Sequence, residues 1–351
     1  MLEGIKQKTP SLTSIVGMVV AVIVVLLAYG AWQVIWPTLG VGKLELKDLS
    51  GRLVYSGKLE SEIAPKTYSL NLTNGSMQVV NESERFGFFS TSAIEFSSAE
   101  NDSNFFFRAV AVDNTSGTTT LVKRVVHAVL PDQVKVLAQE STDQYGTMSW
   151  SESSKMLARS VVGETVSGTE RAITSNWKTL ISNEAGEVQS EIPDAAHPTW
   201  MPNSDVLLYL RSDGIYAYDM DVGAELRLIS FLERGEVFTS VIGIMFEVSP
   251  DGRRLVVTTP GRGNVSVYEV TATMDVTKLY SRDNDSVSYS WPVVSPDGMS
   301  YAVIARDIVN EALANPRIEF YAMDNDRQEV IATQSLADFD PTLVYLDDWI
   351  K

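Results

Sequence analysis

The chain has 351 residues, of which 44% are hydrophobic and 21% are charged, and its net charge is −17. This length is typical of about two domains, and the hydrophobic share is sufficient for a buried core. The negative charge argues against nucleic acid or an anionic lipid surface as the main partner of the large domain. Because cysteine is absent, disulfides, thiol catalysis and cysteine-ligated metal sites are excluded.

An apolar segment from Ile15 to Trp36 contains a single strongly polar residue. As a helix it is ~33 Å long, which is enough to cross the hydrocarbon core of a bilayer. Trp32 and Trp36 lie at its C-terminal end, where membrane-spanning helices carry interfacial aromatic residues. We expect Ile15, Trp32 and Trp36 to belong to a transmembrane helix (residues 15–36) that follows a short cytoplasmic tail, residues 1–14.

A cleaved signal peptide is the alternative, since Lys6 and Lys8 precede the segment and Ala28 to Gly30 offers a small-residue cleavage site. The apolar core of a signal peptide runs to about 15 residues, and this segment continues beyond the cleavage site, which favours an anchor. Basic residues on its two sides nearly balance. The short N-terminal tail and the Asn-x-Ser/Thr sequons downstream therefore decide the orientation. We expect a single-pass cell-membrane protein whose C-terminal domain is extracytoplasmic.

Residues 42–80 read as short strands separated by polar turns. Polar and apolar residues alternate from Tyr68 to Leu72, which indicates a β-strand, and Asn74-Gly75 is a favoured hairpin turn. The range resembles a PEGA-type domain. Tyr55 to Lys58 occupies the place of that family's strand–Asp-Gly-Lys turn, and Ala64-Pro65 occupies that of its Thr-Pro. The resemblance implies a small β module between the anchor and the rest of the chain.

Four related stretches of thirteen residues begin at Ser149, Thr199, Glu247 and Val293, with a period of about 48 residues. Each reads as strand, turn, strand, and the turn is Ser-Pro-Asp-Gly or a degenerate form of it. Proline sets φ, aspartate caps the turn's own backbone, and glycine adopts the left-handed φ. The residues assigned to these structural blade turns are Pro202, Pro250, Asp251, Gly252, Pro296, Asp297 and Gly298.

A third strand recurs in each period, as in Val265 to Glu269, and a fourth follows it. Four short strands per period are typical of a β-propeller. The pattern resembles the TolB-like, WD-type propeller repeat family over Gly146 to Tyr345. We predict an all-β protein with a propeller of five or six four-stranded blades over residues 82–351. Residues 82–145 supply one or two blades, and Pro341 to Leu346 closes the ring against the first.

The last repeat contains an insertion, Asp307 to Pro316. Ile308, Val309, Ala312 and Leu313 have helical spacing, so we expect a short helix there. It is a neutral loop insertion or, alternatively, a binding element.

No hydrolase, zinc-protease or phosphate-loop motif occurs in the sequence. His127 lies in a predicted strand and His197 at a blade start, and neither has a partner at metal spacing, so both are interpreted as structural. Acidic clusters at Asp219 to Gly223, Asp283 to Asp285 and Asp324 to Asp326 are interpreted as turns rather than calcium sites. No catalytic residue, metal or cofactor is assigned, and we predict that the chain is not an enzyme.

These features favour a membrane-anchored propeller that binds a protein or a cell-envelope polymer. One alternative is a glycan-acting enzyme that uses the propeller funnel, which requires clustered carboxylates or perturbed groups at the axis. Another is a structural subunit of an envelope complex, because Gly17 and Ala21 form a small-residue pair suited to helix association.

Overall fold

The computed structural model describes most of the chain beyond residue 45. The described residues are 46, 49–61, 66–79, 94–101, 104–113, 120–129, 133–140, 147–162, 177–231, 245–259, 263–324 and 329–350. Within these ranges, no helix combines the length and apolar character needed to span a bilayer. The predicted tail and the predicted transmembrane helix, with Ile15, Trp32 and Trp36, lie outside the described residues.

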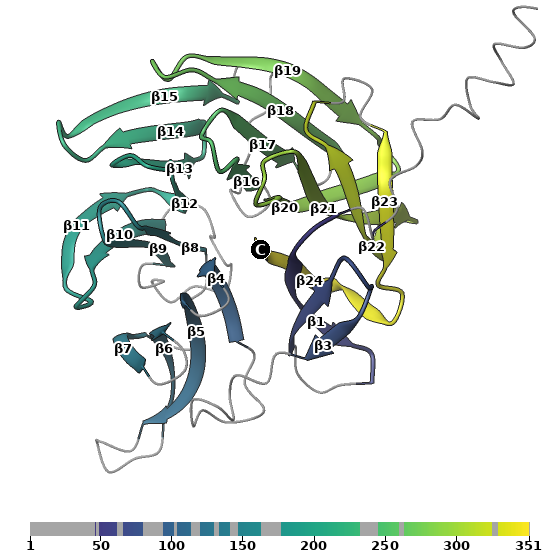
Figure 1. The fold of residues 1–351 in the computed structure, drawn as a ribbon, viewed down its shortest axis with the longest axis horizontal. Helices are drawn as coiled ribbons and strands as arrows, with labels where there is room; N and C mark the ends of the chain where they lie inside the picture. The colour runs from purple at the N-terminus through teal and green to yellow at the C-terminus, as the bar shows by residue number, and fades with distance from the viewer. Residues whose placement is uncertain are drawn as a thin grey trace, which may run out of the picture. The chain divides into compact units, whose positions relative to one another are not determined.

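Residues Glu45–Lys351 form one compact unit, built from six four-stranded sheets that surround a common axis as propeller blades (Figure 1). The all-β prediction and the higher of the two expected blade counts are confirmed. From the axis outward, the blades are β24 (Phe339–Ile350), β1 (Arg52–Leu59), β2 (Lys66–Asn71), β3 (Met77–Val79); β4 (Ile94–Asn101), β5 (Asn104–Asp113), β6 (Thr120–Val129), β7 (Gln133–Glu140); β8 (Met148–Ser151), β9 (Met156–Val162), β10 (Trp177–Asn183), β11 (Val188–Pro193); β12 (Ala196–Trp200), β13 (Val206–Arg211), β14 (Gly214–Asp219), β15 (Ala224–Ser230); β16 (Met245–Val248), β17 (Arg254–Thr259), β18 (Asn264–Val270), β19 (Val276–Asp283); and β20 (Val287–Val294), β21 (Ser300–Val309), β22 (Ala312–Ala322), β23 (Val330–Ser335).

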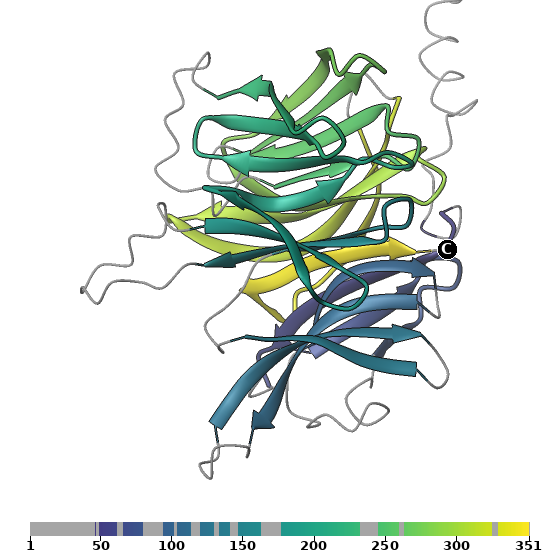
Figure 2. The same ribbon diagram turned by 90° about the vertical axis from the view of Figure 1, so that its left-hand side faces the viewer.

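Every neighbouring pair of strands within these sheets is antiparallel, and the blades twist strongly when seen from the side (Figure 2). Apolar side chains fill the space between adjacent blades. One cluster joins Leu208 and Ile215 to Val257 of the next blade, and another joins Val267 to Tyr301 in the same way. Because each sheet buries both faces against its neighbours, its inner strands are apolar on both sides.

The ring is closed by the C-terminal strand, which pairs with the first strand of the same unit. β24 runs antiparallel to β1, with Arg52 opposite Ile350 and Leu53 opposite Trp349. The indole Nε1 of Trp349 donates a hydrogen bond of 2.9 Å to the carbonyl oxygen of Ser50. Closure through this C-terminal strand was expected, but its partner strand was not the one predicted.

The strands predicted to form a small PEGA-like module over residues 42–80 belong to the propeller instead. β1, β2 and β3 are the outer strands of the blade whose axial strand is β24. Tyr55 stacks on Tyr68 with ring centroids 5.4 Å apart, and both rings contact Phe339 of β24. The local β pattern was read correctly, but the partner that buries it lies almost 300 residues away, as the 299-residue separation of Trp349 and Ser50 shows.

The Ser-Pro-Asp-Gly turns connect the two axis-proximal strands of two blades. The hydroxyl of Ser249 donates to the carboxylate of Asp251 over 2.6 Å, and the same carboxylate accepts the Arg253 N–H. Gly252 has a φ of 72°. The turn from Ser295 to Ser300 repeats this arrangement, with Asp297 bonded to Ser295 and Met299.

The insertion in the last blade is a β-hairpin, so the prediction of a short helix was wrong. β21 and β22 continue past the sheet, with Ile308 opposite Leu313 and Val309 opposite Ala312. Asn310 and Glu311 both have positive φ, 50° and 65°, as in the two-residue hairpin turns that match strand twist. The four apolar residues, Ile308, Val309, Ala312 and Leu313, are therefore paired across a hairpin, although their spacing also fits a helix.

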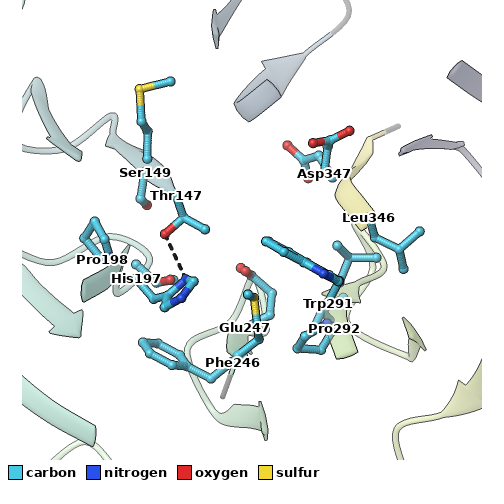
Figure 3. A pocket seen from close by; sticks show the side chains of 16 residues that line it. Thr147, Ser149, His197, Pro198, Phe246, Glu247, Trp291, Pro292, Leu346 and Asp347 are labelled. Atoms are coloured by element: carbon cyan, nitrogen blue, oxygen red, sulfur yellow. Dashed lines mark hydrogen bonds between the residues drawn. The ribbon is translucent and has the colours of Figure 1, made fainter. Parts of the chain in front are cut away.

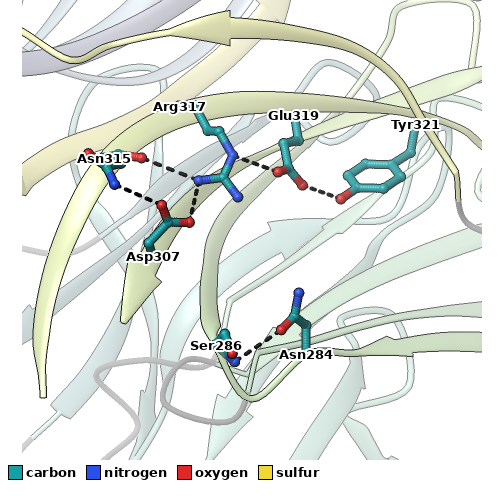
Figure 4. Close-up of polar contacts among 7 residues, drawn as sticks. All are labelled: Asn284, Ser286, Asp307, Asn315, Arg317, Glu319 and Tyr321. Atoms are coloured by element: carbon teal, nitrogen blue, oxygen red, sulfur yellow. Dashed lines mark hydrogen bonds and ion pairs between the residues drawn. The ribbon is translucent and has the colours of Figure 1, made fainter. Parts of the chain in front are cut away.

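A polar network holds the base of this hairpin (Figure 4). The Arg317 guanidinium donates to Asp307 and to Glu319, each over 2.7 Å. Asn315 also donates to Asp307, and the Tyr321 hydroxyl donates to Glu319. The hairpin is thus tied to the buried part of its own blade.

Candidate functional site

A cavity of about 150 Å³ lies on the propeller axis, between strands β8, β12, β16, β20 and β24. Figure 3 shows side chains from all of these elements gathered around it. Engineered protein cavities of about this volume hold one benzene ring. The cavity is therefore large enough for a single small ring, and it is the place where the inner strands of different blades meet.

Two residues of this cavity have a strained backbone at the same position of the repeat. His197 in β12 and Trp291 in β20 each precede a proline, and their φ values are 50° and 54°. The pairing register shifts at both places, between Ala196 and Thr199 and between Ser290 and Val293. Positive φ is unfavourable for side chains of this size. Such strain is concentrated at functional sites, where it re-aims a side chain.

His197 is held as a neutral imidazole at the wall of the cavity. Its ring Nδ1 lies 3.3 Å from the hydroxyl oxygen of Thr147, and its backbone N–H donates to Ser160 over 2.9 Å. The side chain is buried, and this burial lowers the pKa of His197 to about 4. At neutral pH the ring therefore carries no charge and offers one hydrogen-bond donor and one acceptor.

Glu247 points into the same cavity from β16 (Figure 3). Burial, and to a lesser extent the nearby Asp348 carboxylate, together raise the pKa of Glu247 to about 8. At neutral pH Glu247 is therefore protonated and can donate a proton. Asp347, next to Asp348 in β24, accepts a hydrogen bond of 2.7 Å from the Ser56 hydroxyl. Three carboxyl groups thus converge on one cavity in unequal environments.

Trp291 contributes an aromatic ring to the cavity wall. The indole of Trp291 lies 6.5 Å from the His197 ring, edge to face, and 5.4 Å from the ring of Tyr345. Figure 3 shows the indole between the Glu247 and Asp347 side chains. An aromatic face beside carboxyl groups is suited to a ring that has both polar substituents and an apolar face.

The other residues weighed as possible ligands in the sequence do not line this cavity. His127 stacks on Phe106, with ring centroids 4.2 Å apart, within a layer that also contains Trp150. Asp219 accepts hydrogen bonds from the backbone of Asp221 and Val222, as a turn residue does. In the part of the chain that the structure describes, no group of three or more His, Asp or Glu side chains is arranged to hold a metal ion.

Of the residues weighed as possible ligands in the sequence, only His197 lines the cavity, and it was interpreted as structural. Glu247, Trp291, Asp347 and Asp348 were not recognised, because single acidic or aromatic residues carry no motif. One signal was available. His197-Pro198 and Trp291-Pro292 occupy equivalent positions when the repeats are aligned, and a proline in a central strand indicates a bulge.

No family model matches the sequence, and no curated protein matches it. Several solved structures are similar in fold. The periplasmic gluconolactonase of Pseudomonas aeruginosa is 13% identical, with 80% of this chain and 81% of that chain covered and a TM-score of 0.48. A luciferin-regenerating enzyme is 9% identical, with coverages of 77% and 91% and a TM-score of 0.48. A protein from Lactobacillus plantarum is 10% identical, with coverages of 86% and 96% and a TM-score of 0.45.

Two of these similar proteins are named as enzymes, which contradicts our prediction from the sequence that this chain is not an enzyme. That prediction rested on the absence of catalytic motifs, and such motifs do not describe sites assembled from single residues of different blades. At these identities the likeness concerns the fold alone. The chain is a six-bladed β-propeller with a small acidic and aromatic cavity on its axis.

Proposed function

We propose that the axial cavity is the active site of a hydrolase that cleaves a bond next to a small polar ring, such as the terminal sugar of a glycan. The observation that carries this proposal is the convergence of Glu247, Asp348 and Trp291 on one cavity of about 150 Å³. The glycan-acting alternative required clustered acids or perturbed groups at the axis, and both are present.

Glu247 is the proton donor in this proposal. A general acid must carry its proton at the working pH and release it to the leaving oxygen. Its pKa of about 8 meets the first requirement. Asp348 remains as the partner carboxylate, able to activate water or to stabilise positive charge on the sugar ring. Paired carboxyl groups with unequal environments divide the acid and base roles in this way. Trp291 supplies a face on which the ring packs.

The test is turnover of aryl glycosides and of sugar lactones by the full-length protein. We expect the Glu247→Gln variant to lose activity by ~10²–10⁴-fold, the usual contribution of a general acid. Glu191→Gln is the matched control, because Glu191 is an exposed residue of β11, paired with Lys178, and lies outside the cavity. Equal activity of Glu247→Gln and wild type, or turnover of neither substrate class by wild type, refutes the proposal.

We also infer that residues 15–36 anchor the chain in the cell membrane and that the propeller is extracytoplasmic, where it meets a cell-envelope polymer or a protein. The apolar segment, with its single strongly polar residue, and its terminal Trp32 and Trp36 support this inference. The similarity of the Ser-Pro-Asp-Gly repeats to TolB-like propellers fits such a setting. Carbonate extraction of membranes tests the anchor, and labelling of intact cells with an impermeant crosslinker tests the orientation and recovers a partner.

A further inference from the structure

We propose that the axial cavity selects a sugar ring that carries a positively charged amine and discriminates against phosphorylated and carboxylated sugars. The reaction rests on the function proposed above, whereas this selectivity rests on the charge and the side chains of the cavity itself. It can therefore be tested by binding alone, without turnover.

Among the described residues, the ionisable side chains that line the cavity are three carboxyl groups and the neutral imidazole of His197. Among the residues that the structure describes, no lysine or arginine lines the cavity, and none occurs in the sequences of β4, β8, β12, β16, β20 or β24. The acidic residues of these axial strands are Glu95, Glu100, Glu247, Asp340, Asp347 and Asp348. A ring bearing phosphate or carboxylate would enter this cavity without a cationic partner, which strongly disfavours its burial.

An organic cation finds complementary groups instead. The Asp347 and Asp348 carboxylates attract positive charge, and Trp291 lines the same cavity. Figure 3 shows the Trp291 indole between Glu247 and Asp347. A cation over an aromatic face is attracted by the ring's electrons, and the attraction is stronger when water is excluded. The Tyr345 ring packs against Trp291, with ring centroids 5.4 Å apart, and helps to hold the indole in place.

His197 adds a second observation that points to a ligand. Its side chain is only 8% exposed, and Nδ1 is engaged with Thr147. Among the described residues the other ring nitrogen has no hydrogen-bond partner, although it belongs to a residue that lines the cavity. When Nδ1 donates to Thr147, Nε2 presents a lone pair that can accept an N–H from an ammonium group.

An organic cation suits this arrangement better than a metal ion. Divalent metals need several oxygen or nitrogen ligands converging on one point. Within the described ranges, no set of three or more such side chains meets this condition. Aromatic surface contributes nothing to coordinating Ca²⁺ or Mg²⁺, whereas it contributes directly to holding an amino sugar.

The experiment is calorimetric titration of the full-length protein at pH 7 with glucosamine, N-acetylglucosamine and glucuronate. We expect glucosamine to bind at least tenfold more tightly than N-acetylglucosamine, and glucuronate not to bind. Asp348→Asn should weaken glucosamine binding tenfold or more and leave N-acetylglucosamine binding unchanged. Asp338→Asn is the control, because Asp338 is exposed just before β24. Should Asp348→Asn fail to fold, Asp347→Asn and the loss of glucosamine affinity with added salt take its place.

Equal affinity for glucosamine and N-acetylglucosamine, binding of glucuronate, or glucosamine binding that disappears with EDTA would overturn the proposal. The two proposals fail in different ways. Turnover of neutral aryl glycosides that depends on Glu247, without preference for the amine, keeps the hydrolase and rejects the selectivity. Tight, Asp348-dependent binding of glucosamine without turnover of any substrate keeps the selectivity and rejects the hydrolase.

Discussion

Glu247 makes the fold less stable as the pH rises, whereas a carboxylate held in an ion pair makes a fold more stable as the pH rises. Its pKa is raised from 4.5 to about 8 by burial and by Asp348. The folded state therefore holds this proton more tightly than the unfolded state does. The contribution of this proton to the free energy of unfolding is fully present below pH 4.5 and is lost as the pH rises through 8. Glu247→Gln replaces the carboxyl group by an amide of the same shape that stays neutral throughout.

The magnitude follows from the distance between the two pKa values. A difference of one pKa unit corresponds to ~1.4 kcal/mol, so the full interval between 4.5 and 8 corresponds to ~5 kcal/mol. Because the Glu247 side chain is partly exposed to the cavity, solvent screening reduces this value, and we expect about half of it, ~2–3 kcal/mol.

The assay is urea denaturation of wild type and Glu247→Gln between pH 4.5 and pH 9. We expect the variant to match wild type at pH 4.5 and to be more stable by ~2–3 kcal/mol at pH 9. Other titrating groups cancel in the difference between the two proteins. A difference that does not change with pH would refute the reasoning.

Three further outcomes follow from the buried polar groups and the hairpin. Glu140→Gln removes the carboxylate that pairs with two buried arginines at 2.9 and 3.0 Å, and we expect urea denaturation to show a loss of ~3–5 kcal/mol; a loss below ~1 kcal/mol would mean that the arginines find other partners. Arg306→Met removes bonds to the carbonyl oxygens of Pro341 and Val344 in the closing strand. Hydrogen exchange should then speed up first in β24, and uniform exchange would contradict this. Glu311→Gly, at a φ of 65°, should raise stability by ~0.5–1 kcal/mol; a lower melting temperature would contradict the turn geometry.

The blade repeats could be predicted because each is a local unit. The turns containing Pro250 and Pro296 predict a pair of strands within thirteen residues. The alternation of polar and apolar residues then indicates how these two strands pair. Residues 52–79 show the limit of this reasoning. Their strands were recognised, but whether they form a module or a blade depends on β24, and no local pattern encodes a partner at the other end of the chain.

The axial site could not be predicted for a related reason. Glu247, Asp348 and Trp291 come from three blades, and each is one acidic or aromatic residue among many in an acidic chain. Only the ring brings them together, and only burial between blades raises the pKa of Glu247. Prediction of the insertion failed for a different reason. Four apolar residues in six positions fit both a helix and a hairpin, and the positive φ values of Asn310 and Glu311 decide between them.

Closure by β24 has a consequence for the folding of the protein during its synthesis on the ribosome. The Ser56 hydroxyl meets its acceptor, Asp347, 291 residues further along the chain. At a translation rate of about 5–20 residues per second, β1 waits roughly 15–60 s for its partner strand. Throughout that time its inner edge is open to pairing with other nascent chains. Shielding of this edge until β24 emerges would therefore favour correctly closed rings over pairing between chains.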